Sequence, residues 1–544
     1  MDVTQIYAIV AGSLFAVLTT VNFCIHLWTL VQTYTVWVLR HIVYPFFLRR
    51  HRLVGPWSRR GFILRNIYIL TNIFCSAYRT QTMMEAGKRT GILSLINLMP
   101  LFFGPHLDFL AKLMGVSLHN LHIIHGSAAI MSVLLSAAHA ILSVLGGQWN
   151  TLAWSPRLYA LLVSLVYHSF TSDTENNQSV SSLALLFFSF AQCIRRPSYE
   201  LFLRAHQACA MLCAYSMWRH VTNKLVFPGL CIYISSGIFV VITAFELLWI
   251  TYRNFTFHRG FSRAKIAAVR GAIRIKIQVR RPWNIRAGQY VNLWLPGVGY
   301  RALLESHPFM IVSWAVDDSW KPKLTTIELL VEPRDGFTHR LLRYASRSSE
   351  ETKHLVLYSG PHGAPTSMKE YGSVLMIATG FGIAAILPHL KELVDGYERC
   401  EVATRRIHVV WQLKGEDDEL AAKDLIDEAL KMDSFKWILQ ISIFYERKMV
   451  GSQIEGNHGR IFHLDGVLDP REILMREIHG DYERYFNGEL IAWTGKETGA
   501  ILVAVSTQAD LRDDIRTLVQ ENVNHNVRFL ELEYQPADLG FRSS

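Results

Sequence analysis

The sequence predicts a multi-span α-helical membrane domain followed by a soluble β-barrel and an α/β domain. Three observations lead to this fold class. Half of the 544 residues are hydrophobic and only 18% are charged, compared with roughly a quarter charged in soluble proteins. Long apolar runs stop near residue 253. Beyond that point, short strand-like and helix-like segments alternate, with glycine and proline between them.

These changes of pattern divide the chain into four parts. Residues 1–60 are expected to form an N-terminal anchor span and a basic loop, and 61–255 the helical membrane domain. Residues 256–366 are expected to form the β-barrel, and 367–544 the α/β domain.

Seven apolar runs approach the roughly 20 residues that a bilayer-spanning helix requires. The count is open by one, because one run is short and 158–169 is a further short apolar stretch. The first run is expected to be a retained anchor, because Asp2 precedes it and no basic region does. The spans are predicted at 7–32, 61–80, 89–105, 120–146, 179–196, 205–222 and 226–251.

The net charge of +10 comes partly from arginine clusters beside these runs, as in the cytosolic loops of membrane proteins. With seven spans, a cytosolic 49–60 loop also places 195–204 and everything after residue 253 in the cytosol. We therefore expect membrane lipid as a partner. We expect no nucleic-acid partner, because no recognition motif accompanies the charge.

Two pairs of histidines lie inside predicted spans, His125 with His139 and His206 with His220, each 14 residues apart. Fourteen helical steps return to nearly the same face about 21 Å further along. Two such helices side by side offer two stacked bis-histidine sites, and haem iron accepts axial imidazoles. We expect His125 to face His206 near the cytosol, and His139 to face His220 near the exterior. His122 is rotated off this stripe and is not expected to be a ligand.

Alternating segments at 270–300, 307–313, 324–331 and 355–358 predict antiparallel strands of a compact β-barrel. A buried strand at 374–378 then leads into Gly380-Phe381-Gly382 and an apolar helix. A glycine turn between strand and helix lets backbone N–H groups approach a phosphate. Strands at 407–411, 437–443 and 500–505 and a helix at 418–432 complete an alternating α/β domain.

In this order, the motifs resemble the ferric reductase family of transmembrane flavocytochromes, especially its fungal members, and more distantly the NADPH oxidases. The motifs are 89–100, the histidine pairs, 199–202, 288–290, 307–309, 360–363 and 380–382. The resemblance implies ferredoxin reductase-like flavin and nucleotide domains. It also implies that cytosolic NADPH gives hydride to FAD, and that electrons pass through two b-type haems to an exterior acceptor, in a multi-pass protein of the plasma membrane.

The resemblance also implies binding roles, with no residue singled out as catalytic. For NADPH, a 2′-phosphate needs a cation beyond the second strand, and Lys414 is the candidate. The residues matching the flavin motifs are Gln289, His307, Pro308, Phe309, Ile311 and Ser313. Those matching the nicotinamide-nucleotide motifs are Gly360, Gly363, Gly380, Gly382 and Pro388.

The chain departs from the family pattern at three places. The arginines that usually follow the first histidine are absent after His125, and Met310 replaces a hydroxyl residue. Ser506-Thr507-Gln508 stands where the family has Cys-Gly-Pro near the hydride-transfer site. These departures leave a weakened or altered hydride transfer open.

Three functions follow from this pattern. The expected one is metalloreduction, with ferric or cupric chelates as exterior acceptors. The same route ending on oxygen would make the chain a superoxide-generating NADPH oxidase, and a degenerate member would be a non-catalytic membrane protein. The four spaced histidines disfavour the last, and the fungal layout with a seventh span favours the metal.

Overall fold

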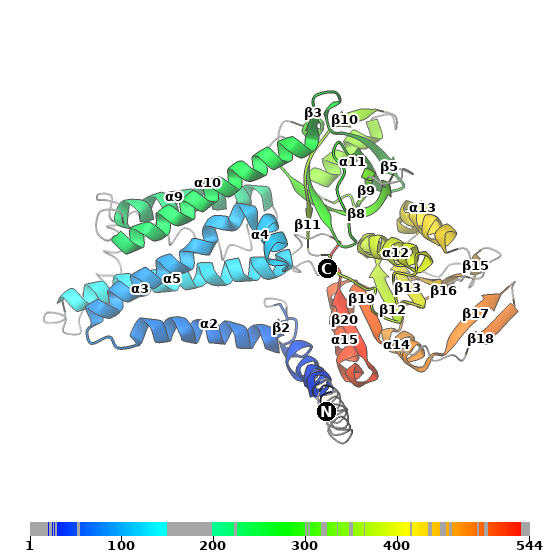
Figure 1. Ribbon diagram of the computed structural model, residues 1–544, viewed down its shortest axis with the longest axis horizontal. Coiled ribbons are helices and arrows are strands. Elements are labelled where there is room, and N and C mark those ends of the chain that lie inside the picture. Colours follow the sequence, from blue (N-terminus) through cyan, green and yellow to red (C-terminus); the bar gives the residue numbers. More distant parts are fainter. Residues whose placement is uncertain are drawn as a thin grey trace, which may run out of the picture. The chain divides into compact units, whose positions relative to one another are not determined.

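The computed structural model describes residues 30–51, 55–148, 199–221 and 226–534, with short gaps inside the last range and three isolated positions before residue 30. Two compact units result. One holds Met1–Ile63, Arg253–Pro361 and Pro365–Ser544; the other holds Leu64–Tyr252 with His362–Ala364. The expected fold class is confirmed, because a helical membrane region is followed by a barrel and an α/β domain (Figure 1).

Three helical runs in the described part are long and apolar enough to cross a membrane: Met83–Met114, Leu118–Ser143 and Pro228–Asn254. The span expected at 89–105 is therefore the middle of a longer run, because a 3₁₀ segment, η2 (Met99–His106), continues the helical path from α3 to α4. The predicted span 179–196 and most of 7–32 lie outside the described residues. The helices are α2 (Arg59–Ala77), α3 (Met83–Leu98), α4 (Leu107–Met114), α5 (Leu118–Gln148), α9 (Tyr199–Val221) and α10 (Val226–Asn254).

Helices α3 and α5 pack along a face of small residues. The Thr82 hydroxyl caps α3 by accepting a hydrogen bond from the Glu85 backbone N–H. One helical face further on carries Gly87, Gly91 and Ser94, at the spacing that lets two membrane helices approach closely. The Ser94 hydroxyl lies 2.8 Å from the carbonyl oxygen of Ser132 on α5 and donates to it. Polar groups in this interface are thus satisfied between the two helices.

The barrel is a curled antiparallel sheet with an isoleucine-rich core. Ile273, Ile275 and Ile277, which alternate along one strand, are completely buried. The single strand expected at 355–358 is two short strands, because the chain changes partners there. The sheet order is β10-β5-β6-β9-β8-β7-β11. These strands are β5 (Arg263–Val269), β6 (Ala272–Gln278), β7 (Tyr290–Trp294), β8 (His307–Val316), β9 (Leu324–Val331), β10 (Lys353–Leu355) and β11 (Leu357–His362), with helix α11 at Phe337–Arg347.

The α/β domain has a seven-stranded sheet, parallel except for β15, in the order β15-β16-β14-β13-β12-β19-β20. Helices α12 and α13 cover one face, and α14 and α15 the other (Figure 1). The strands are β12 (Ser373–Thr379), β13 (Arg406–Leu413), β14 (Leu439–Tyr445), β15 (Gln453–Glu455), β16 (Ile461–Asp465), β19 (Ile501–Ser506) and β20 (Val527–Glu531). The helices are α12 (Ile383–Glu398), α13 (Glu416–Met432), α14 (Pro470–His479) and α15 (Ala509–Glu521).

The first strand of this domain lies between the second strand and a much later one. Because β12 pairs with β13 on one side and β19 on the other, the strand order reverses at its carboxyl end. Ligands of open α/β sheets bind at such a switch point. The topology thus selects the end of β12 before any side chain is considered.

A segment before α2 is seated on the α/β domain, which the sequence did not predict. The Arg516 guanidinium on α15 donates to the carbonyl oxygens of Tyr44 and Val43, at 2.9 and 2.6 Å. The Tyr44 hydroxyl accepts from the backbone N–H of Phe529 at 3.0 Å. Arg50 pairs with Asp513 at 3.0 Å. The basic loop and the α/β domain are therefore in direct contact.

Two short hairpins, β1 (Phe46–Leu48) with β2 (Trp57–Ser58) and β3 (Phe255–Thr256) with β4 (Gly260–Phe261), lie near the chain's entries to the membrane helices.

Helix α14 is attached to the sheet by a buried charge network. Its Glu477 carboxylate receives hydrogen bonds from Arg406 at 2.9 and 3.0 Å and lies 2.7 Å from His408 Nδ1. Burial raises the pKa of Glu477. The positive charge of Arg406 and the hydrogen bond from His408 lower this pKa by more than burial raises it, to about 2. Glu477 is therefore a carboxylate in the folded protein at neutral pH.

Replacing Glu477 by glutamine should destabilise the α/β domain by about 3 to 5 kcal/mol, because Arg406 would be left buried without a counter-charge. Urea unfolding of the full-length protein in detergent, followed by proteolysis, measures this. The matched control is Glu472→Gln on the same helix, whose partner Arg476 is exposed; a change below about 1 kcal/mol is expected there.

The free energies of unfolding of the wild type and of Glu477→Gln should also depend differently on pH. Because the folded pKa of Glu477 is lower than its ordinary value of 4.5, its stabilisation is complete above pH 4.5 and declines as the pH falls toward 2. The difference in free energy of unfolding between the wild type and Glu477→Gln should therefore become smaller as the pH is lowered from 7 to 3. A difference that stays constant would contradict a charged Glu477.

Candidate functional site

The inner histidine pair comes together in the membrane unit. His125 on α5 and His206 on α9 are close enough that their charged forms would repel each other. The Phe202 ring stacks on His206 with centroids 5.9 Å apart, and η2 approaches His125 so closely that a Cβ on Gly104 would lie 3.1 Å from the His125 ring. Each ring thus has one close neighbour, Phe202 for His206 and the backbone at Gly104 for His125.

Both inner imidazoles keep a buried nitrogen that the described chain does not satisfy. Neither His125 Nδ1 nor His206 Nδ1 has a hydrogen-bond partner in the described part. An unsatisfied polar atom is costly in a membrane interior. Two facing imidazoles are a donor set that haem iron accepts, so these residues fit a haem held between α5 and α9.

His139, predicted as a haem ligand of the second pair, is oriented by a backbone contact. Its Nδ1 lies 2.7 Å from the carbonyl oxygen of Gly87 on α3. Because a carbonyl only accepts, Nδ1 carries the hydrogen and Nε2 keeps its lone pair. Metal-binding histidines commonly donate their second nitrogen to a backbone carbonyl in this way. The predicted partner, His220, lies on α9, and its side chain is outside the described residues.

Gly91 leaves the space that the His139 ring occupies. A Cβ on Gly91 would lie 2.9 Å from His139 Nδ1. Gly91→Val should therefore displace the imidazole and remove one haem, measured as haem per protein in the purified sample. Gly126→Val on α5 is the matched control, because a Cβ there has nothing within 4 Å. Equal haem content in both variants would refute a ligand role for His139.

A second polar pair in the membrane unit was missed by the sequence analysis. The buried His106 lies with Nδ1 2.8 Å from Glu246 Oε2 and Nε2 2.9 Å from the Thr243 hydroxyl. Glu246 is the only acidic residue in the predicted span 226–251, which was the available signal that it needs a partner. Its partner is 140 residues distant in the chain, so no local pattern identifies it.

Strand β8 divides the predicted flavin motif between two faces. Phe309 and Ile311 belong to the barrel core, whereas Val312 belongs to the core of the α/β domain. Pro308 pairs with Asn292 on the neighbouring strand β7. Phe309 and Ile311 thus support the strand from inside, and a flavin held here would meet the opposite face.

His307 begins this strand and is held as a neutral ring. It stacks on Phe337 with centroids 4.2 Å apart and planes 17° from parallel. Burial lowers the pKa of His307 to about 4, opposed by Glu305 and reinforced by Arg340, which itself pairs with Glu305 at 2.6 Å. At physiological pH, His307 therefore presents a hydrogen-bonding imidazole without charge.

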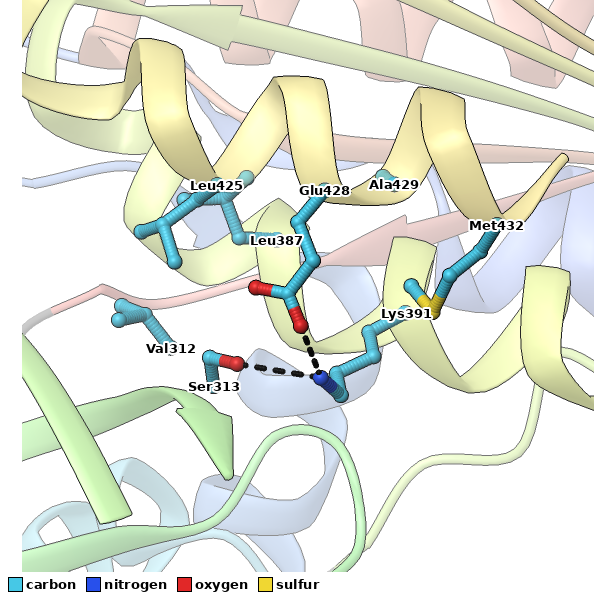
Figure 2. Close-up of a pocket in the computed structure, with 8 residues that line it drawn as sticks. All are labelled: Val312, Ser313, Leu387, Lys391, Leu425, Glu428, Ala429 and Met432. Carbon is cyan, nitrogen blue, oxygen red and sulfur yellow. Dashed lines mark hydrogen bonds and ion pairs between the residues drawn. The ribbon is translucent and has the colours of Figure 1, made fainter. Parts of the chain in front are cut away.

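Gln289 and Ser313 both have contacts within the protein. The Gln289 side-chain oxygen accepts from the Arg286 backbone N–H at 3.0 Å, which shapes the turn before β7. Lys391 on α12 donates to the Ser313 hydroxyl at 3.3 Å and pairs with Glu428 on α13 at 2.8 Å. Figure 2 shows these three side chains at a small cavity between β8 and the two helices. Ser313 thus links the barrel to the α/β domain in this structure.

The glycine turn lies at the switch point, as expected. A Cβ on Gly382 would come within 2.0 Å of the Ser506 carbonyl oxygen at the end of β19, so only glycine fits. The Gly380 carbonyl accepts from the Trp411 indole N–H on β13 at 2.8 Å. The Gln508 backbone N–H donates to the Thr379 hydroxyl at 3.0 Å. The turn is therefore fixed by both neighbouring strands.

Three of the remaining predicted nucleotide residues lie in the described part of the chain. Gly360 and Gly363 have φ values of +136° and +86°, which favour glycine, at the end of β11. Pro388 is buried within α12. Lys414 lies outside the described residues.

Replacing Gly382 by alanine should abolish reduction of the flavin by a nicotinamide nucleotide, because the turn must move away from β19. FAD content should remain, since the barrel is untouched. Anaerobic flavin bleaching by NAD(P)H measures reduction by the nucleotide, and bleaching by dithionite measures how much FAD the protein holds. Normal bleaching by the nucleotide would show that this turn is not the binding site.

A helical membrane unit, followed by a flavin-type barrel and a nucleotide-type α/β domain, defines a transmembrane flavoprotein architecture. Three family models match in that order: the ferric reductase like transmembrane component at 90–217, an FAD-binding domain at 259–366 and the ferric reductase NAD-binding domain at 371–454. The chain is thus a member of the ferric reductase family and contains its FAD-binding and NAD-binding domains.

Curated relatives are fungal. Ferric reductase transmembrane component 4 of Saccharomyces cerevisiae is 26% identical over 59% of this chain and 41% of the relative. Ferric/cupric reductase transmembrane component 2 of the same yeast is 24% identical over 64% and 45%. Its namesake in Schizosaccharomyces pombe is 24% identical over 56% of each. The chain spans less than half of the two budding-yeast relatives.

Solved structures give weak likenesses. A flavohemoglobin from Malassezia yamatoensis is 11% identical and covers 86% of this chain and 98% of its own, with a TM-score of 0.33. The ferredoxin reductase of carbazole 1,9a-dioxygenase is 11% identical over 50% and 68%, with a TM-score of 0.32. Likenesses of this strength say nothing about function.

Proposed function

We propose that the chain carries electrons from a cytosolic reduced nicotinamide nucleotide, through FAD and two b-type haems, to ferric or cupric chelates outside the cell. The observation that carries the proposal is the inner pair, His125 and His206, confined together with buried nitrogens that the described chain leaves unsatisfied. Flavin accepts a hydride and releases single electrons, which haem iron carries one at a time.

In this proposal the chain's own residues hold and orient the nucleotide, the flavin and the haems, and they take no part in acid-base chemistry. The turn at Gly380 and Gly382 would hold the nucleotide's pyrophosphate through backbone N–H groups at the start of α12. His307 would border the flavin as an uncharged ring. His125 with His206 and His139 with His220 would hold the two haems. One hydride carries two electrons, so each nucleotide oxidised reduces two Fe(III) to Fe(II) and leaves one proton in the cytosol.

The orientation of the chain is part of the proposal. The ion pair between Arg50 and Asp513 joins the basic 49–60 loop to the α/β domain, which supports placing both on one side of the membrane. An excess of arginine marks the cytosolic side. The nucleotide and flavin domains would therefore face the cytosol, and the acceptor would be met at the outer face of a plasma-membrane protein.

Cells expressing the chain should reduce an impermeant ferric chelate, and superoxide dismutase should leave the rate unchanged. His206→Leu should remove one haem from the reduced-minus-oxidised spectrum and nearly all of the activity. His122→Leu, one helical turn from His125, is the matched control and should keep both.

Two results would redirect the proposal. Loss of the signal with dismutase would make oxygen the acceptor and the chain an NADPH oxidase-type enzyme. Absence of haem and of NAD(P)H-dependent bleaching in the purified protein would indicate a non-catalytic member.

A further inference from the structure

The hairpin that follows the last membrane helix exposes aromatic side chains. Strands β3 and β4 pair directly after α10 ends at Asn254. Phe257, in the turn between them, is 93% exposed, although its ring meets that of Phe255 edge-on with centroids 5.6 Å apart. Phe261 on β4 is 44% exposed. The hairpin thus presents apolar surface that the described part of the chain does not cover.

The length of the chain keeps this turn close to the membrane. The candidate span Pro228–Asn254 carries Trp249 and Tyr252 near its end, and these residue types are typical of the headgroup level. Phe257 is three residues beyond the span, which limits its distance from the end of the span to about 10 Å. The headgroup layer of a bilayer is itself roughly 5 to 8 Å thick on each side. The turn is therefore within reach of lipid headgroups.

Three arginines lie at the base of the hairpin. Nε and Nη2 of Arg280 donate to the carbonyl oxygen of Phe261 at 3.2 and 2.8 Å. Partial burial lowers the pKa of Arg280, and the positive charges of Arg259 and Arg263 lower it further. The three guanidiniums are therefore near enough to repel one another. Among the described residues, none of the three forms an ion pair with a carboxylate.

The exposed face of the neighbouring strands continues this positive charge. Two residues after Arg263 on β5, Lys265 stands opposite Lys276 on β6 and opposite Lys353 on β10. Like charges directly opposite each other across strands are destabilising. Glu328 lies 3.3 Å from Lys276 and offsets its charge, but it is the only carboxylate that pairs with these lysines in the described part. A surface that keeps such charges together favours an extended, negatively charged partner.

We propose that this surface binds the headgroups of anionic phospholipids in the leaflet where α10 ends. Its residues are Phe257, Arg259, Arg263, Lys265, Arg280 and Lys353. Basic side chains beside a membrane span attract anionic lipids, and an exposed phenylalanine among them can enter the boundary between headgroups and acyl chains. Continuity with the span thus favours a lipid over a soluble anion. The inference goes beyond the proposed function, and it needs no electron transfer.

The test measures hydrogen exchange of the backbone amides at 255–263 in the full-length protein. The protein is reconstituted in nanodiscs of phosphatidylcholine, alone or mixed with phosphatidylserine at several mole fractions. A ligand that binds the closed hairpin suppresses its local opening and slows exchange. We expect phosphatidylserine to slow exchange there by about fivefold or more, because each basic residue gains roughly that factor at an anionic surface.

Arg259→Gln combined with Arg263→Gln should remove most of this response to phosphatidylserine. The matched control is Arg270→Gln combined with Arg399→Gln, which removes two exposed charges elsewhere in the same unit. Arg270 is seven residues from Arg263, about 23 Å along β5, so the control should respond as the wild type does. Phe257→Ser should speed exchange in both lipid mixtures and leave their ratio unchanged. FAD content, read from the visible spectrum, shows that each variant is folded.

Three outcomes would overturn the inference. The first is hairpin exchange in the wild type that does not respond to phosphatidylserine. The second is a response that persists when Arg259 and Arg263 are both replaced. The third is slowing by inorganic pyrophosphate in phosphatidylcholine discs without any response to phosphatidylserine, which would assign this surface to a soluble phosphate. None of these results depends on haem or on nucleotide oxidation, so the proposed function is tested separately.

Discussion

The membrane unit depends on one rule, that a polar atom inside a bilayer must have a partner. The hydrogen bond from His139 Nδ1 to the Gly87 carbonyl obeys it, and it requires α3 and α5 to lie close together. Such an approach leaves no room for side chains: a Cβ on Gly87 would lie 3.2 Å from Leu142 Cβ, and one on Gly91 would meet the His139 ring. The glycines and serines that weaken the apolar character of α3 are therefore what lets the histidine be oriented.

The soluble unit builds its candidate site largely from backbone. The carbonyl of Ser506, the carbonyl of Gly380 and the N–H of Gln508 make the contacts that fix the turn. Any residue at position 506 supplies the carbonyl against which Gly382 is packed. The bond from the Gln508 N–H to Thr379 is instead particular to this chain, because the proline of the Cys-Gly-Pro pattern has no N–H to donate.

Local sequence patterns predicted the helices and strands, but they did not predict which side chains distant in the sequence contact each other. Alternation located the strand carrying Ile273, Ile275 and Ile277, and the order strand, glycine, helix located the turn, because both signals lie within a few residues. The same alternation, applied to Phe309 and Ile311, would have assigned them to the barrel interior. The pair of His106 with Glu246 and the seat of Tyr44 on α15 leave no periodic trace, since their partners are 140 and 472 residues away in the chain.

The seat of Tyr44 also sets an order of events during synthesis. Its partner Arg516 is translated 472 residues later, which at about 5 to 20 residues per second is a delay of roughly half a minute to a minute and a half. Throughout that interval α2 can already enter the membrane, while the segment preceding it remains without its surface. The contact between the segment at Tyr44 and α15 can therefore form only late in synthesis. If translation stops before α15, Tyr44 and Arg50 have no surface to pack on and stay accessible to chaperones and proteases.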